Sequence, residues 1–352
     1  MKLRLLSLFL ALTLLLCGCT DMPVQELPQP SLDPDSTGNN ILTVHFIDVG
    51  QADCALLESD GQYILIDGGN VEDGQLVISY LEQQGVEELS AVFCTHAHED
   101  HVGGLPSVLA VYPTAAVYAP TRTYASNVFD DFMYYVDQQG LEVTIPEPGD
   151  ELSLGQARIT VLGPTQSYAE TNNTSIVLLV EFLNTRFLFT GDMETSAEND
   201  MLDYWGDDLD WNVDVLKVGH HGSNTSSGYR FVYETDPEYA IISVGTGNSY
   251  GHPNEEIVSR YNDAGVPMFR TDELGTILAV SDGQTITVTW ENSQKEPADV
   301  EPADTRYIGN ANSRKFHSST CGSLPKEENR VYFDSYEEAI EAGYTPCGSC
   351  LN

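Results

Sequence analysis

The chain has 352 residues and is strongly acidic, with 15 Lys plus Arg against 54 Asp plus Glu and a formal net charge of -39. A field of this sign repels nucleic acids and anionic membranes, so the composition argues against a protein that gathers polyanions over its whole surface. The length and apolar content suffice for one large domain and a smaller one.

The N-terminus has the pattern of a bacterial export signal. A basic start precedes an apolar run over residues 5–16, which is shorter than the roughly 20 residues of a membrane span. The run ends in Cys17-Gly18-Cys19 and resembles a lipobox, which implies that residues 1–19 are a lipoprotein signal peptide and that Cys19 carries the lipid. An ordinary cleaved signal is the alternative. Residues 20–40, rich in Pro, Asp and Ser, are expected to be a flexible tether.

The folded part is expected to begin at residue 41 with a series of strands. Apolar and β-branched runs predict strands over residues 41–49, 54–58 and 63–66, and Asp67 with two glycines follows the last of them. Helical spacing over residues 76–84 ends at a glycine. A further short apolar run at residues 91–94 predicts a buried strand that leads into a polar loop.

That loop, Thr95-His96-Ala97-His98-Glu99-Asp100-His101, is the most informative stretch of the chain. Imidazole and carboxylate are the ligand types that suit zinc, manganese or iron, and neither is stable when buried without a partner. A solvated histidine-rich loop is the alternative. The density of ligand types at a strand end favours a metal site.

Two later strand ends carry the same chemistry. A predicted strand over residues 186–190 leads into Gly191-Asp192, and a carboxylate with two oxygens can bridge two cations. A strand over residues 214–218 leads into Gly219-His220-His221-Gly222 and contains Lys217. His221 or His220 is expected to complete a second metal site, and Lys217 is either a positive charge near the substrate or a surface lysine.

The loop His96-x-His98-x-Asp100-His101 resembles the H-x-H-x-D-H motif of the metallo-β-lactamase superfamily. The resemblance implies an α/β fold, an αββα sandwich over residues 41–291, with two Zn (or Mn) ions. It assigns the first metal to His96 and His98, the second to Asp100, His101 and His221 (or His220), the bridge to Asp192 and a supporting carboxylate to Asp67. The superfamily's third-motif histidine is missing, and Asn172, Asn173 or Ser175 stands in its place.

Four separated motifs also resemble the hydrolase domain of the ComEC competence proteins; they are Asp48-Val49-Gly50-Gln51-Ala52-Asp53, residues 217–223, Tyr250-Gly251-His252-Pro253 and Arg270-Thr271-Asp272. This resemblance implies a phosphodiesterase or nuclease with metal-activated water and a phosphodiester substrate, possibly DNA. The residues expected to take part in catalysis are Asp100, Asp192, Lys217 and His220. ComEC joins this domain to a membrane channel, whereas no transmembrane segment is expected here after the signal.

The tail contains a separate metal-binding pattern after an expected linker at residues 292–304. His317 and Cys321, then Cys347 and Cys350, can supply four tetrahedral ligands for a structural zinc, and a disulfide is the alternative. Residues 305–352 resemble the zinc-binding module of the Ada protein and are expected to form a small α+β unit. His317 stands where Ada has its methyl-accepting cysteine, so alkyl transfer is not implied. The tail is also relatively basic, so docking of a polyanion is conceivable.

These features predict a lipid-anchored or secreted metal-dependent phosphodiesterase on the extracellular face of a bacterial membrane. Hydrolysis of a small ester, lactone or β-lactam is the alternative within the same chemistry. A non-catalytic surface binding protein is the alternative outside it. The two metal centres are expected to behave as independent units, because the tail zinc has four protein ligands while the hydrolase has a large core of its own.

Overall fold

The structure, a computed structural model, describes residues 41–292, 307–318, 321, 323–348 and 350–351. The export signal with Cys19, the tether and nearly all of the linker lie outside these residues, so those assignments stay predictions. Within the described part of the chain, no helix combines the length and the apolar character that a bilayer crossing demands.

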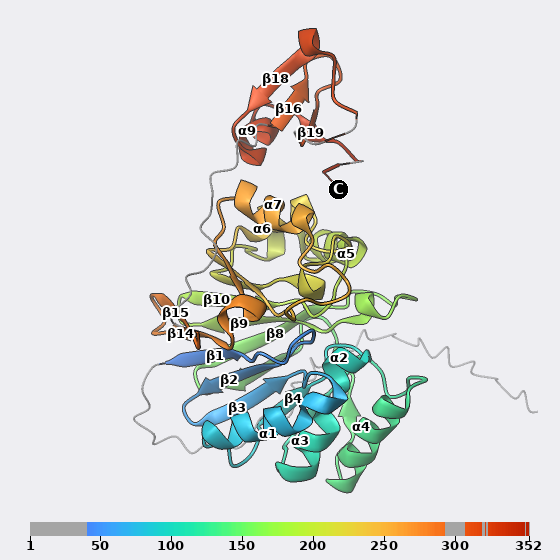
Figure 1. Cartoon of the computed structure of the whole chain (residues 1–352), viewed down its shortest axis with the longest axis vertical. Coiled ribbons are helices and arrows are strands. Elements are labelled where there is room, and N and C mark those ends of the chain that lie inside the picture. The colour runs from blue at the N-terminus through green and yellow to red at the C-terminus, as the bar shows by residue number, and fades with distance from the viewer. Residues whose placement is uncertain (1–40, 293–306, 319–320, 322, 349, 352) are drawn as a thin grey trace, which may run out of the picture.

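Two mixed sheets face each other at the centre of the larger domain (Figure 1). The first has the order β15-β14-β1-β2-β3-β4-β5-β6. Its strands are β1 (Leu42–Phe46), β2 (Ala55–Ser59), β3 (Gln62–Ile66), β4 (Ala91–Phe93), β5 (Val117–Tyr118), β6 (Val143–Thr144), β14 (Ile277–Ser281) and β15 (Ile286–Trp290). The second has the order β13-β12-β11-β10-β9-β8-β7. Its strands are β7 (Glu151–Leu154), β8 (Ala157–Gly163), β9 (Val177–Phe182), β10 (Thr185–Phe189), β11 (Val215–Lys217), β12 (Tyr239–Ile242) and β13 (Met268–Arg270).

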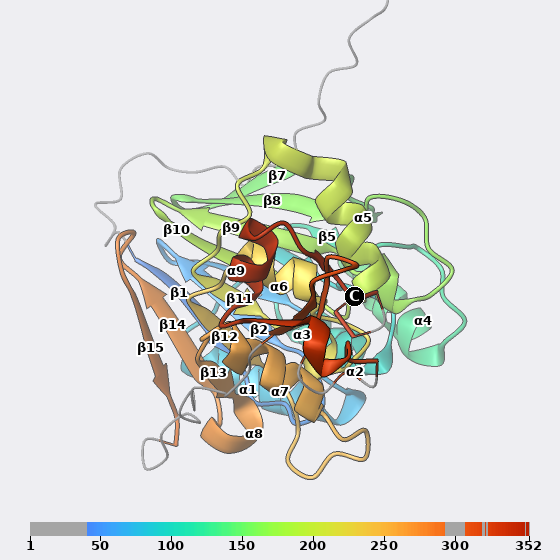
Figure 2. The ribbon, with the colours of Figure 1, turned by 90° about the horizontal axis from the view of Figure 1, so that it is seen from above.

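Helices cover the outer face of each sheet, which gives the expected αββα sandwich (Figures 1 and 2). The first sheet is covered by α1 (Gly74–Gln83), α3 (Leu105–Val111) and α4 (Asn127–Gln138), with the short α2 (Glu99–Val102) beside them. The second is covered by α5 (Thr195–Trp205), α6 (Tyr229–Thr235) and α7 (Glu255–Asp263). The connections include α8 (Thr271–Leu274) and the 3-10 turns η1 (Val71–Asp73), η2 (Asn172–Thr174), η3 (Gly206–Asp208) and η4 (Gly219–Gly222).

Strand alternation divides the core into layers. In β3, Ile64 and Ile66 face the second sheet, whereas Leu65 between them packs under α1 and its neighbouring helices. Phe182 and Phe187 reach the same central layer from the second sheet. Because side chains of a strand alternate between its faces, the near-continuous apolar runs in the sequence correspond to strands that are buried on both sides.

The aromatic segment between residues 124 and 135 contributes largely to the core. It forms the amphipathic helix α4, which sequence reasoning did not identify as a helix. Phe129 and Phe132 are fully buried, Tyr134 is 55% exposed, and Tyr124 lies 6.3 Å from the His98 ring.

The strand directions bring the polar loops together. β3 runs parallel to β4, and β10, β11 and β12 run parallel to one another. Carboxyl ends of parallel strands lie at the same edge of a sheet, and the two sheets are joined there by a hydrogen bond from the Ile176 amide to the Thr95 carbonyl (2.9 Å). The candidate metal ligands all follow these strand ends.

The C-terminal module is a small separate sheet of order β18-β16-β17-β19. Its elements are β16 (Tyr307–Asn310), β17 (Lys315–His317), η5 (Glu327–Asn329), β18 (Arg330–Phe333), α9 (Tyr336–Glu341) and β19 (Thr345–Pro346). It sits above α6 and α7, outside the four layers of the sandwich (Figures 1 and 2).

Candidate metal centres

The histidine loop is held by contacts that leave no room for side chains behind it. The His101 carbonyl accepts from the Gly68 amide at 2.8 Å, and a Cβ added to Gly104 would lie 2.0 Å from the Gly68 carbonyl oxygen. The glycines that follow the histidines are therefore required for close backbone approach. They fix the direction in which His96, His98 and His101 leave the end of β4.

Asp67 supports this loop from behind, as the resemblance implied. One carboxylate oxygen accepts from the Thr95 amide at 2.7 Å, and the other lies 2.7 Å from the Thr95 hydroxyl and 2.8 Å from His101 Nδ1. A ligating imidazole commonly donates its second N–H to a carboxylate in this way. His101 Nδ1 is then the protonated nitrogen, and its Nε2 lone pair faces the centre.

Four groups converge on a single point between the sheets. One ligand atom from each of Asp100, His101, Asp192 and His221 lies within 4.8 Å of the others. His101 Nε2 is 3.2 Å from Asp192 Oδ1, and His221 Nε2 is 3.4 Å from Asp100 Oδ2. These three buried atoms of His101, Asp192 and His221 make no hydrogen bond of good geometry. Orphaned buried nitrogens and oxygens of these types fit a divalent cation.

The electrostatics of the cluster also favour a bound cation. Burial lowers the pKa of the His221 imidazole, but the charges of Asp192 and Asp53 outweigh it and raise this pKa to about 10. Burial raises the pKa of Asp100, and the neighbouring His221 and His101 imidazoles outweigh burial and bring this pKa down to about 2. Without a metal, the excess of carboxylates retains protons on the histidines, and a divalent cation neutralises the same charge while leaving the imidazoles free to ligate.

Of the two adjacent histidines, His221 has the ligand geometry. Its Nδ1 donates to the Ser243 carbonyl at 2.9 Å, which leaves Nε2 free toward Asp100 and Asp192. His220 is 22% exposed at its side chain, with Nε2 3.7 Å from Asp192 Oδ2. Both histidines have positive φ, 52° and 53°. Backbone strain of this kind at non-glycine residues persists only where surrounding contacts impose it.

The proposed first metal position is formed by fewer protein groups. His96 Nε2 lies 3.0 Å from His98 Nδ1 and 3.9 Å from Asp192 Oδ2. Where the superfamily's third histidine is expected, Asn172 and Asn173 bind the Glu194 carboxylate instead. Three protein ligands would leave coordination positions for water or substrate, and this expectation stays a prediction.

Lys217 lies behind the centre rather than at its open side. Its ammonium is 2.8 Å from Asp53 and donates to the Val218 carbonyl at 2.9 Å, and the side chain is 4% exposed. Asp53 in turn lies 3.3 Å from His221 Nδ1. Asp53 is the last residue of the Asp48–Asp53 motif, and its place behind His221 was not predicted from the sequence. The salt bridge between Lys217 and Asp53 is therefore buried beside His221 Nδ1.

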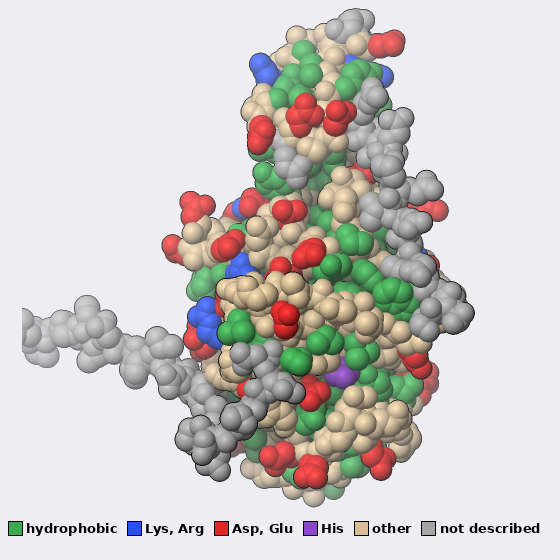
Figure 3. Space-filling model, turned by 90° about the vertical axis from the view of Figure 1, so that its left-hand side faces the viewer, with side chains coloured by type: hydrophobic (Ala, Val, Ile, Leu, Met, Phe, Trp, Pro, Cys, Tyr) green, Lys and Arg blue, Asp and Glu red, His purple; other side chains and the backbone are tan. Residues whose placement is uncertain are grey.

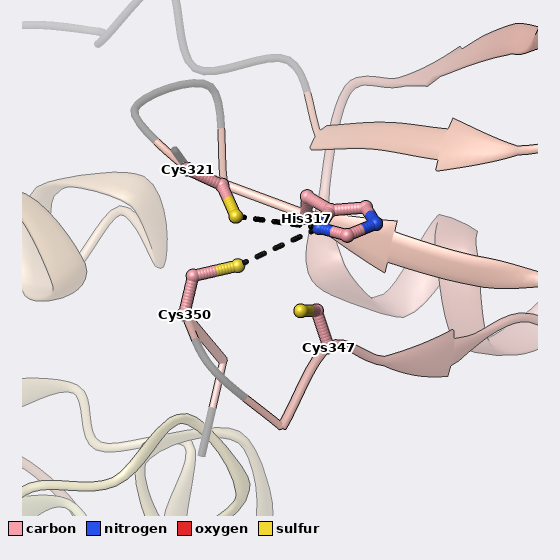
Figure 4. Close-up of side chains that lie close together, drawn as sticks. All are labelled: His317, Cys321, Cys347 and Cys350. Atoms are coloured by element: carbon pink, nitrogen blue, oxygen red, sulfur yellow. Dashed lines mark hydrogen bonds between the residues drawn. The ribbon is translucent and has the colours of Figure 1, made fainter. Parts of the chain in front are cut away.

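The tail residues form a second cluster of metal-ligand type. Ligand atoms of His317, Cys321, Cys347 and Cys350 lie within 4.8 Å of one another, and His317 Nδ1 is 3.4 Å from Cys321 Sγ and 3.9 Å from Cys350 Sγ (Figure 4). The cysteines among the described residues carry no disulfide. Three thiols and one imidazole at this separation are a donor set that suits tetrahedral zinc.

The fold and the converging ligands define a metal-dependent hydrolase. The profile of the metallo-beta-lactamase superfamily matches residues 47–246, and that of the metal-binding domain of Ada matches residues 297–352. The chain belongs to the metallo-beta-lactamase superfamily, and its C-terminal part is an Ada-type metal-binding domain.

Its relatives include two competence proteins. The chain is 29% identical to ComE operon protein 3 of Bacillus subtilis over 253 residues, which is 66% of this chain and 32% of that protein. It is 28% identical to the competence protein ComA of Neisseria gonorrhoeae over 252 residues, which is 70% of this chain and 33% of that protein. The chain therefore matches about a third of the length of these relatives. Among solved structures, the metallo-beta-lactamase fold protein YhfI of Bacillus subtilis aligns with a TM-score of 0.47 at 12% identity, covering 68% of this chain and 99% of that one.

Proposed function

We propose that the protein is a metal-dependent phosphodiesterase, with single-stranded nucleic acid as one candidate substrate. The observation that carries the proposal is the set of orphaned ligand atoms of His101, Asp192 and His221 in a chain related to two competence proteins. When bound, two cations supply an activated water and neutralise the charge that develops on a phosphate. His96 and His98 would hold one of them and Asp100, His101 and His221 the other, with Asp192 between them.

The protein's own groups act on orientation and charge. Asp67 and the Ser243 carbonyl accept from Nδ1 of His101 and His221, so that Nε2 of each ring faces the centre. Lys217 balances the Asp53 charge inside the protein, so its part in catalysis is to position His221. His220 lies at the more exposed side, 3.7 Å from Asp192, where it can contact a substrate oxygen.

A smaller substrate is the second candidate, favoured by the charge of the neighbouring cavity. A cavity of about 680 Å³ beside Asp100 is lined by carboxylates, among them Asp48, Glu72, Asp73 and Glu99. Acidic side chains are also spread over the hydrolase domain and the module on the face in Figure 3, where Lys and Arg are fewer. A long polyanion would be repelled along this path, whereas a small neutral ester, lactone or β-lactam would not.

A substrate panel separates these functions. The full chain is assayed with added Zn²⁺ or Mn²⁺ against bis-p-nitrophenyl phosphate, single-stranded DNA, nitrocefin and a lactone. Phosphodiester turnover that is lost in Asp192→Asn and kept in the exposed control Asp137→Asn supports the proposal. Turnover confined to nitrocefin or the lactone supports the second candidate. Bound metal without turnover of any of them supports a binding protein.

We also propose that the protein is exported and held at the extracellular face of a bacterial membrane by a lipid on Cys19, reaching that membrane only through this anchor. The support is the sequence pattern over residues 1–19. Labelling of expressing cells with a fatty-acid precursor is expected to mark the wild type and not Cys19→Ala. Equal labelling of both forms contradicts the anchor.

A further inference from the structure

The C-terminal module packs directly against the start of α6. Tyr229, the first residue of α6, is 7% exposed and belongs to the module's apolar cluster with Tyr307 and Phe316. Its ring stacks on Tyr336 of α9 at 6.0 Å with planes 8° apart, and Tyr233 lies 5.2 Å from the same ring. Aromatic pairs at these distances contribute about 0.5–1.5 kcal/mol each beyond the area they bury. The module is therefore a packed neighbour of the hydrolase domain.

The same end of α6 continues the loop that carries His220 and His221. Ser226 Oγ donates to the Gly219 carbonyl at 2.8 Å, and the Ser223 amide donates to the His220 carbonyl at 2.8 Å. Both histidines are held at positive φ. The loop thus depends on support from the residues around it, and its C-terminal end leads directly into Tyr229.

Buried charged side chains connect the end of the His220–His221 loop to Tyr229. Glu198 of α5 accepts from the amides of Ser227 (2.5 Å) and Gly228 (2.8 Å). Arg260 of α7 donates to the Ser227 carbonyl, and its guanidinium lies 4.1 Å from the centre of the Tyr229 ring. Glu198 and Arg260 are 2% and 5% exposed. Tyr229 is the group that covers Arg260 on the side of the module.

We propose that the zinc-binding module holds the His220–His221 loop in its metal-binding conformation, with Tyr229 and Arg260 as positioning residues. Zinc bound by His317 and the three cysteines supplies the folding energy of the module. In the folded module, Tyr307 and Tyr336 pack against Tyr229. Tyr229 and Arg260 then hold Ser227 at the end of the loop. Loss of the structural zinc then weakens cation binding at the hydrolase centre. The two centres are coupled, in contrast to the independence expected from the sequence.

The test measures metal affinity without a substrate, so it stands apart from the proposed phosphodiesterase activity. Mn²⁺ prefers nitrogen and oxygen ligands and leaves the thiolate site to zinc, so Mn²⁺ titration followed by electron paramagnetic resonance reports the hydrolase centre. Three variants of the full chain are compared with the wild type. Tyr336→Ala removes the ring that stacks on Tyr229, Tyr332→Ala removes a module tyrosine that is 49% exposed, and Cys347→Ser removes a zinc ligand.

The expected result is an Mn²⁺ affinity lowered about tenfold in Tyr336→Ala and in Cys347→Ser, with Tyr332→Ala like the wild type. The zinc of the module is expected to remain bound in Tyr336→Ala and to be lost from Cys347→Ser. Should the hydrolase domain of Cys347→Ser fail to fold, Tyr336→Ala decides. Wild-type Mn²⁺ affinity in Tyr336→Ala, or in a folded Cys347→Ser, overturns the coupling, as does an equal loss in Tyr332→Ala.

Discussion

Asp67→Asn is expected to place the wrong nitrogen of His101 toward the metal while leaving the fold in place. The Asp67 oxygen that accepts from the Thr95 amide must remain an oxygen, because an amide nitrogen there would face an N–H at 2.7 Å. The new amide nitrogen then occupies the other position, 2.8 Å from His101 Nδ1, and donates to it. His101 becomes protonated at Nε2, the atom that faces the centre.

The expected magnitude is a ten- to hundredfold loss of metal affinity, or about 1.4–2.8 kcal/mol, which is the range for partners that orient a ligating histidine. The assay is the Mn²⁺ titration, with bis-p-nitrophenyl phosphate turnover measured on the same samples. Asp137→Asn, on the exposed face of α4, is the matched control. Unchanged Mn²⁺ affinity in Asp67→Asn would refute the reasoning that this carboxylate sets the His101 tautomer.

Three further predictions concern buried groups around the site. Gly104→Ala is expected to lower the free energy of unfolding by about 1–3 kcal/mol, because the added Cβ would lie 2.0 Å from the Gly68 carbonyl oxygen. Urea unfolding measures this change, and an unchanged midpoint would contradict the close approach. Burial raises the pKa of Glu198 from 4.5 to about 7, so this group releases its proton less readily in the folded state and its contribution to stability falls as the pH rises from 4.5 to 7. Relative to Glu198→Gln, the wild type is expected to lose up to about 3 kcal/mol between pH 4.5 and 8, and parallel pH profiles of the two proteins would contradict it. Lys217→Met leaves the Asp53 carboxylate buried without its partner and is expected to lower the free energy of unfolding by about 3–5 kcal/mol. Much of this stability is expected to return when Asp53→Asn is added. A double-mutant cycle with no interaction energy would contradict the ion pair.

The sequence predicted individual strands, because strands that are buried on both faces leave apolar runs that turn signals interrupt. The sandwich itself was implied by the resemblance of the histidine loop to the metallo-β-lactamase motif. The sequence did not predict α4, although the buried residues Phe129, Phe132 and Val136 have the spacing of one helix face. Tyr134 and Tyr135 extend the aromatic run and obscure that spacing.

The candidate ligands could be selected from the sequence because imidazoles and carboxylates follow successive strand ends. The mutual orientation of these ligands could not be predicted from the sequence. The Lys217 side chain was expected near the substrate, yet the pairing with Asp53 spans the two sheets and depends on their packing. The contact between Tyr229 and Tyr336 likewise joins segments that the linker separates, and no local pattern marks either ring as an interface residue.

The most direct test of the account is metal-dependent phosphodiester turnover by the full chain. Chelated protein is expected to be inactive toward bis-p-nitrophenyl phosphate and to regain activity with Zn²⁺ or Mn²⁺, while Asp192→Asn stays inactive at every metal concentration. Turnover that persists in the chelated wild type, or that Asp192→Asn retains, would contradict a hydrolase built on the converging ligands of the two sheets.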